Sequence, residues 1–333
     1  MEKIRNSEDQ PNQRQFIYSL KAFAILSVIC AHTASVSKLD SFSNVIAGKI
    51  LNSLGSIGVV VFFIIAGFLF ANSNYSLINF FKKRVITILI PWVATGTIVY
   101  CYVAIRKNGI NLIDWLYFIT GNKSYLYFLP MLLACYLISF LINKSLIKLI
   151  LIVIFSLLCI LLTTNNLLTQ INPYMNPFNW FFYFGIGYLL FIFNKLYVLV
   201  DFAKRNFFLL GIIFILCLFA FSIHRNIGYW TREYLFFEFI SVNCIFAICS
   251  LPSIYESKLI NIIGKESFSI YLIHMPFAGV VAYLLSFVDF APVTLIRPFL
   301  VLFLSLAAIY VFKLISKKLK MDSFLPILIG SRE

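Results

Sequence analysis

The chain has 333 residues, of which 61% are hydrophobic and 12% are charged. Soluble domains are about half apolar and a quarter charged, so the composition excludes a water-soluble protein and predicts an all-α, polytopic integral membrane protein. The formal net charge of +14 is expected to reflect basic cytoplasmic loops and contact with membrane lipid, not nucleic-acid binding.

Ten apolar stretches are long enough to cross a hydrocarbon core about 30 Å thick. In chain order they cover residues 16–36, 50–72, 85–105, 124–142, 146–163, 177–194, 206–223, 234–251, 266–288 and 294–315. We therefore expect a transmembrane domain of about ten helices over residues 16–315. A cytoplasmic segment over residues 1–15 is expected to precede it, and a cytoplasmic tail over 316–333 to follow it.

The basic residues indicate how these stretches are oriented. If the N-terminus is cytoplasmic, most of the 27 Lys and Arg residues fall on the cytoplasmic side. Membrane proteins carry such an excess in their cytoplasmic loops. An odd number of spans would put the basic C-terminal tail outside, so we expect an even number and two cytoplasmic termini.

Lys21 and His32 are ionisable residues inside the first apolar stretch. Eleven positions make about three helical turns, so the two side chains share one face and lie roughly 16 Å apart along the axis. Ionisable groups at membrane depth are costly and usually functional. Alternatively, Lys21 could snorkel to the inner interface and His32 could only bond a neighbour. Together the two predict a polar channel from the inner to the outer half of the membrane.

The second and third stretches contain backbone-altering residues. Gly55, Gly58 and Gly67 are expected to allow close helix packing, in preference to substrate contact. Pro91 is expected to kink the third helix.

Three basic residues, Lys82, Lys83 and Arg84, lie at the start of the third stretch. They could serve only to fix the topology. Alternatively, they could hold an anionic substrate that carries phosphate groups.

The ninth stretch carries Ser267, Ser269, Tyr271 and His274. Ser267, Tyr271 and His274 follow one another at helical spacings of four and three, so they lie on roughly one face. We expect these four residues to line a substrate channel. His274 is either a second functional histidine or part of a local hydrogen-bond network.

Other classes of site have little support in the sequence. The seven cysteines lie in apolar stretches without a CxxC pair or a histidine at metal-ligand spacing, so they are interpreted as small hydrophobic residues, and no metal site is expected. Walker, GxSxG and HExxH motifs are absent, and acidic residues are sparse. The expected outer loop over residues 164–176 has no charge. It is either an inert connection or a contact for an uncharged glycan.

The ordered set of these residues resembles the membrane acyltransferase-3 family along nearly the whole chain. In its first helix the family has a basic residue, ten further residues and then His, and the next helix has Phe-Phe-x-x-Ser-Gly-Phe. A Phe-x-x-(Lys/Arg)-Arg…Pro stretch follows, and Ser-x-Tyr-Leu-x-His-x-Pro lies near the C-terminal end. Here these features are Lys21 and His32; FFIIAGF over residues 62–68; Phe81, Arg84 and Pro91; and Ser269, Tyr271, Leu272, His274 and Pro276. Two positions depart from the pattern: Lys21 stands where the family usually has Arg, and Ala66 where it has Ser.

The resemblance implies an acyltransferase of the bacterial inner membrane. It would move an acyl group, most often acetyl from acetyl-CoA, to a hydroxyl of a cell-envelope polysaccharide or lipid-linked saccharide, with no tightly bound cofactor. His32 would act as general base or transient acyl carrier, and Lys21 would position the donor. Arg84, with Lys83 and Lys82, would hold the CoA phosphates at the inner mouth.

Two other classes of function share most of these features. A carrier or flippase for a lipid-linked saccharide would have the same spans and buried polar face, but it would consume no acetyl-CoA. Transporters often show paired broken helices in corresponding halves, and no internal repeat is visible here. In a purely structural partner of a glycan-assembly complex, His32→Ala would leave the acylation of the glycan unchanged.

Overall fold

The computed structural model describes residues 12–35, 41–73, 76–107, 109–122, 124–168, 172–223, 230–321 and 325–331. Within these ranges all regular structure is helical and no strand occurs, which confirms the expected all-α fold. The helical elements are α1 (Gln13–Thr33), α2 (Phe42–Gly55), α3 (Ile57–Ala71), α4 (Leu77–Arg84), the π-helix η2 (Val85–Leu89), α5 (Ile90–Lys107), α6 (Leu112–Ile119), the 3₁₀ turn η3 (Tyr125–Tyr127), α7 (Phe128–Ile142), α8 (Leu146–Thr164), the 3₁₀ turn η4 (Pro173–Met175), α9 (Pro177–Ile192), α10 (Leu196–Arg205), α11 (Phe207–Ile223), α12 (Arg232–Cys249), α13 (Pro252–Tyr255), α14 (Lys258–Leu284), α15 (Ala291–Lys318) and α16 (Leu325–Leu328).

Several of these helices are suited to cross a membrane, as expected for a multi-pass membrane protein. In the described part of the chain, seven segments are long and apolar enough: Gln13–Thr33, Phe42–Ala71, Leu77–Ile105, Tyr125–Ile142, Leu146–Thr164, Lys258–Leu284 and Ala291–Lys318. Helices α9 and α10 pass the same test only as a pair, and they are bent by 103°.

The other expected spans correspond to helices that do not pass this test alone. Helix α9 has 16 residues and α11 has 17. Helix α12 carries three charged residues, Arg232, Glu233 and Glu238. The count of about ten spans and the cytoplasmic position of both termini therefore stay predictions.

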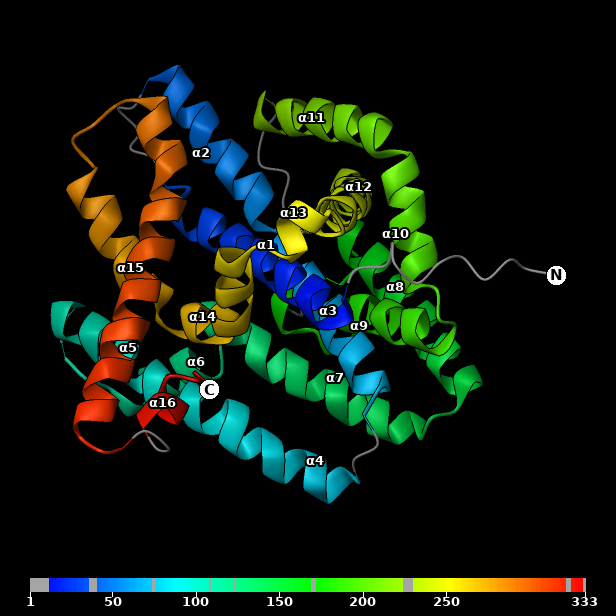
Figure 1. Ribbon diagram of the computed structural model, residues 1–333, viewed down its shortest axis with the longest axis horizontal. Coiled ribbons are helices and arrows are strands. Elements are labelled where there is room, and N and C mark those ends of the chain that lie inside the picture. The colour runs from blue at the N-terminus through cyan, green and yellow to red at the C-terminus, as the bar shows by residue number, and fades with distance from the viewer. Residues whose placement is uncertain are drawn as a thin grey trace.

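Helix α1 lies in the middle of the bundle, with α14 on one side and α2 and α3 on another (Figure 1). The break between α2 and α3 packs closely against α1. A Cβ on Gly55 would lie 2.4 Å from Ala31, and one on Gly58 would lie 2.2 Å from the Ala24 carbonyl oxygen. The Gly58 N–H also donates to Ser27 Oγ at 2.7 Å. Both glycines therefore serve helix packing, as predicted.

Helices α3 and α9 approach each other through a reciprocal pair of glycines. A Cβ on Gly67 would lie 1.8 Å from the Phe184 carbonyl oxygen, and one on Gly187 would lie 1.9 Å from the Ile64 carbonyl oxygen. No side chain fits at either position without moving a backbone. The expected packing role of Gly67 is thus confirmed, with Gly187 as its counterpart.

The expected irregularity at Pro91 takes the form of a π-helical turn. Proline has no N–H to donate and crowds the preceding turn, and such positions are where helices widen or kink. The Ile90 N–H reaches back five residues to the Val85 carbonyl. This turn begins directly after Arg84, so it sets the direction in which α4 leaves the bundle.

We predict that Gly187→Val destabilises the fold while Gly211→Val does not. Overpacking a close contact costs about 1–3 kcal/mol, whereas a Cβ on Gly211 in α11 would meet nothing within 4 Å. The measurement is the thermal midpoint of each detergent-solubilised variant by fluorescence-detected size exclusion. Equal midpoints for the two variants would contradict the reciprocal glycine contact.

Candidate active site

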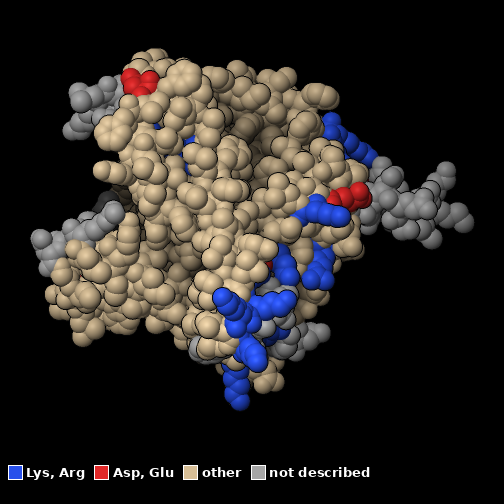
Figure 2. Space-filling model, turned by 60° about the vertical axis from the view of Figure 1, so that its left-hand side comes forward, with Lys and Arg blue, Asp and Glu red and all other residues tan. Residues whose placement is uncertain are grey.

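A cavity of about 530 Å³ lies between α1, α3, α4, α7 and α14. Five basic side chains line it: Arg14, Lys21, Lys83, Arg84 and Lys265. No Asp or Glu among the described residues lines it. Figure 2 shows Lys and Arg gathered towards one side of the molecule, while most of the remaining surface in that view is uncharged. The cavity is therefore a site of positive potential, suited to an anion.

Arg84 is held at the cavity by aromatic rings. Its Cζ atom lies 4.7 Å from the centre of the Phe80 ring and 5.1 Å from that of Tyr136. Such cation–π contacts orient a guanidinium without neutralising it. Its Nε is buried and makes no hydrogen bond within the described ranges.

The three predicted donor-binding residues do not all face the cavity. Arg84 and Lys83 line it, whereas Lys82 is exposed and lies outside the lining. Successive residues of a helix are rotated by about 100°, so three adjacent side chains cannot all point to one site.

Two further cations, Arg14 and Lys265, line the cavity but were not predicted. Arg14 precedes Lys21 by seven residues, about two helical turns, so both lie on the same face of α1. That spacing was a usable signal in the sequence. Lys265 precedes the predicted Ser267 by two residues and offered no comparable pattern.

Part of the cavity lining is apolar. It is formed by Phe62, Ile65, Ala66 and Leu69 of α3 and by Leu132 of α7. Ala66, one of the two departures from the family pattern, thus lies at the cavity. A molecule with a charged end and an apolar arm would match both parts of the lining.

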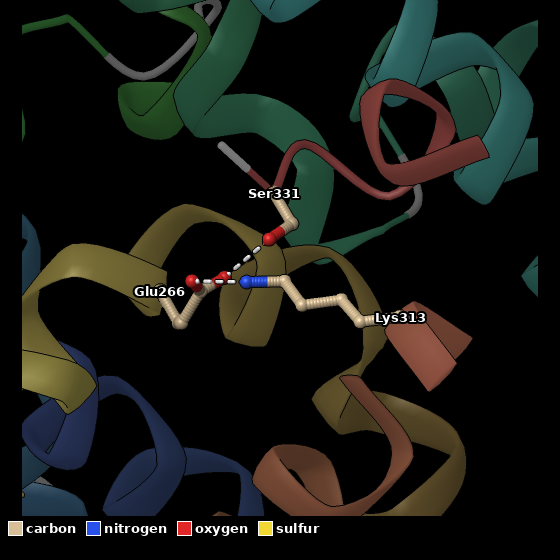
Figure 3. Close-up of polar contacts among 3 residues, drawn as sticks. All are labelled: Glu266, Lys313 and Ser331. Carbon is tan, nitrogen blue, oxygen red and sulfur yellow. Dashed lines mark hydrogen bonds and ion pairs between the residues drawn. The ribbon is translucent and has the colours of Figure 1, made fainter. Parts of the chain in front are cut away.

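The C-terminal segment forms part of the cavity wall. Gly330, which lines the cavity, has a φ of +72°, and a Cβ there would lie 2.6 Å from the Phe268 ring. Figure 3 shows how Glu266 anchors the segment: its carboxylate accepts a hydrogen bond from Ser331 Oγ at 2.7 Å and pairs with Lys313 Nζ at 2.8 Å. Residues 325–331, expected as cytoplasmic tail, therefore fold back onto the bundle.

The two histidines of the predicted site meet next to Tyr271, which lines the cavity. The ring centroids of His32 in α1 and His274 in α14 are 5.1 Å apart. The Tyr125 ring of η3 lies 6.1 Å from His32 and 5.3 Å from His274. His274 is fully buried, and His32 is partly exposed.

The hydrogen bonds of His274 define which ring nitrogen carries the proton. Its Nδ1 lies 2.7 Å from the Tyr271 carbonyl oxygen and 3.2 Å from that of Ile270. Carbonyl oxygens only accept, so the proton is assigned to Nδ1. The Nε2 atom is buried and has no partner among the residues that the structure describes. A local network thus fixes the ring and leaves one nitrogen as a proton acceptor.

The remaining predicted channel residues are divided between the cavity and the core. Ser267 and Tyr271 line the cavity, as does Lys21. Ser269 is fully buried behind it, and its hydroxyl bonds to no described residue. Neither histidine lines the cavity: the Tyr271 ring stands between it and His274, at 6.1 Å from the latter.

In the uncharged segment 164–176, whose residues 169–171 lie outside the described ranges, Tyr174 lies near the histidine end of the site. The Tyr174 ring packs against Tyr127 at 5.3 Å and Trp230 at 5.9 Å. Tyr127 belongs to the same short turn as Tyr125. Burial raises the pKa of the Tyr174 phenol, which therefore stays protonated at neutral pH.

Candidate metal ligands do not gather anywhere in the described part of the chain: no three His, Cys, Asp or Glu side chains come together. All seven cysteines are free thiols.

A family model described as an acyltransferase domain matches residues 14–314, nearly the whole chain. No curated protein and no solved structure matches the chain.

We predict that Glu266→Ala releases the C-terminal segment. The change leaves Ser331 without its acceptor and Lys313 without its ion-pair partner. Losing about 1 kcal/mol raises the population of an open state roughly fivefold. Hydrogen–deuterium exchange of residues 325–331 should accelerate accordingly, and the exposed-site control Glu256→Ala should leave it unchanged. Wild-type exchange in Glu266→Ala would show that other contacts hold the segment.

Proposed function

Because the chain belongs to the membrane acyltransferase-3 family, whose domain model matches residues 14–314, we propose that it transfers acetyl from acetyl-CoA to a hydroxyl of a cell-envelope polysaccharide or lipid-linked saccharide. The observation that carries the proposal is the basic cavity with a pair of histidines next to it. We further propose that it works in the bacterial inner membrane, with acetyl-CoA as a cosubstrate and no resident cofactor.

The cavity suits the donor in charge and in polarity. Coenzyme A carries several phosphate charges at one end and an uncharged pantetheine arm at the other. Arg84, Lys83 and Arg14 supply charged donors for the phosphates, and a guanidinium can bind phosphate with two parallel hydrogen bonds. The apolar wall of α3 accommodates the arm. Lys21 lies two turns nearer to His32 than Arg14 does, so it faces the thioester end.

The histidines provide the proton transfer. The acceptor hydroxyl gives its proton to a neutral imidazole, and its oxygen attacks the thioester carbonyl. The C–S bond then breaks, and the CoA thiolate takes up the proton. We assign this step to His32, with the Nε2 lone pair of His274 beside it. General-base catalysis is worth roughly 10²–10⁴-fold in rate. A transient acyl group on His32 is the other route and differs in forming an acylated enzyme.

A saccharide acceptor is supported by the aromatic rings at the histidine end. Tyr127, Tyr174 and Trp230 come from three separate segments, and each is only partly buried. Aromatic side chains combine apolar faces with polar groups at their edges, which suits the faces and hydroxyls of a sugar ring. In the predicted topology this end faces outside, where envelope glycans are found.

We predict that His32→Ala and His274→Ala each abolish acetylation. Removing the base should lower transfer by about 10²-fold or more. The measurement is ester-acetyl analysis of surface polysaccharide from cells with wild type, each variant or no protein, at matched membrane levels. Wild-type acetylation in both variants would contradict the proposed chemistry, and altered glycan export without any change in ester would favour the carrier.

We predict that Arg84→Ala weakens donor binding while Lys82→Ala does not. A lost charge-assisted hydrogen bond costs about 1.5–3 kcal/mol, so the KM for acetyl-CoA should rise roughly 10- to 100-fold. The measurement is thiol release from acetyl-CoA in membranes. Lys82, which has the same sign of charge but lies outside the cavity lining, is the matched control. Equal effects of the two variants on the KM would contradict the proposal that this cavity binds acetyl-CoA.

A further inference from the structure

We infer that Tyr125 is a positioning residue: with Tyr271 it forms a reciprocal hydrogen-bonded clasp that fixes His274 beside the proposed base His32. The inference deepens the proposed function and rests on the histidine pair being the base. Tyr125 lies in the short turn η3, outside every feature that carried the sequence resemblance.

The clasp begins at a backbone acceptor that helix α14 cannot satisfy by itself. In a regular helix the Leu272 carbonyl would accept from the N–H four residues later, but that residue is Pro276, which has none. The Tyr125 hydroxyl takes this position and donates to the Leu272 carbonyl at 2.7 Å. A side chain from another element thus completes the helix at its proline.

The second half of the clasp runs in the opposite direction. The Tyr271 hydroxyl donates to the Tyr125 carbonyl oxygen at 2.6 Å. Each tyrosine therefore bonds the backbone of the other's segment, which fixes both the separation and the register of η3 against α14. Both side chains are buried, at 7% and 5% exposure, so water does not compete for these bonds.

The clasp acts on His274 through one short piece of backbone. The Tyr271 carbonyl accepts from His274 Nδ1, and the next carbonyl, that of Leu272, accepts from Tyr125. Without the Tyr125 hydroxyl, the buried Leu272 carbonyl has no donor in its own helix, and an unpaired buried carbonyl is costly. The turn must then shift to find a partner, and the Nδ1 bond shifts with it.

The position of the clasp links it to the reaction. Tyr271 lines the basic cavity, and the Tyr125 ring contacts both histidines. The two tyrosines therefore lie between the donor cavity and the histidine pair. A shift of about 1 Å in such a group can cost 10²-fold in rate.

The first test is nitrogen NMR of the protein labelled with ¹⁵N in its imidazole rings, in lipid nanodiscs, with the His274 signals assigned by His274→Asn. We expect wild type to show one tautomer with the proton on Nδ1. Tyr125→Phe should shift these signals towards a mixture of tautomers. Tyr100→Phe is the matched control, because Tyr100 is a buried tyrosine whose hydroxyl also bonds backbone, that of Asn111, away from the histidines.

The second test is the kinetics of acetyl transfer from acetyl-CoA. Tyr125→Phe should lower kcat about 10- to 100-fold while the KM for acetyl-CoA stays within about twofold. Tyr100→Phe should change neither. Adding Pro276→Ala to Tyr125→Phe should recover transfer, since the new N–H can donate to the Leu272 carbonyl.

Three results would overturn the inference: an unchanged His274 tautomer in Tyr125→Phe, equal losses in Tyr125→Phe and Tyr100→Phe, or no recovery with Pro276→Ala. If wild type transfers no acetyl but the NMR signals respond as expected, the clasp stands and the proposed donor is wrong. The two claims are therefore tested separately.

Discussion

The arrangement of the site depends on one hydrogen bond, from the Tyr125 hydroxyl to the Leu272 carbonyl. Pro276 deprives this carbonyl of its usual donor within the helix. Within a membrane there is no water to satisfy a backbone group, so a proline in a buried helix needs a partner from elsewhere. That requirement joins η3 to α14 at the turn that carries His274. The same need for partners explains why His274 Nδ1 bonds the Tyr271 carbonyl.

Charge is organised by a similar constraint. Buried charges are costly unless they are paired, and Glu266, next in sequence to two residues of the cavity lining, is paired with Lys313 and bonded by Ser331. The cations of the cavity lining face a hollow with no acidic residue among its described lining. The described lining is thus positively charged, while Glu266 holds the C-terminal segment in place.

The sequence predicted features that depend on the spacing of residues within one helix, and it missed features that depend on contacts between two segments. Composition indicated the helical membrane fold, and spacing along α1 and α14 indicated Lys21, His32, Tyr271 and His274. Periodicity does not report which helix faces meet, so Lys265 and the folded-back segment 325–331 were not predicted, whereas the spacing of Arg14 from Lys21 was a signal that went unused. Tyr125 lies in a turn of three residues that has no periodic pattern. Lys82 was grouped with Arg84 because they are neighbours, although the helix turns them in different directions.

The most direct test of the account is a cryo-electron microscopy map of the protein in nanodiscs with a non-transferable acetyl-CoA analogue in which oxygen replaces the thioester sulfur. The account predicts phosphate density within hydrogen-bond distance of Arg84 and Arg14, with the acetyl end beside Tyr271 and directed towards the histidines. Density for the analogue at any other place, or an empty cavity at saturating analogue, would contradict it.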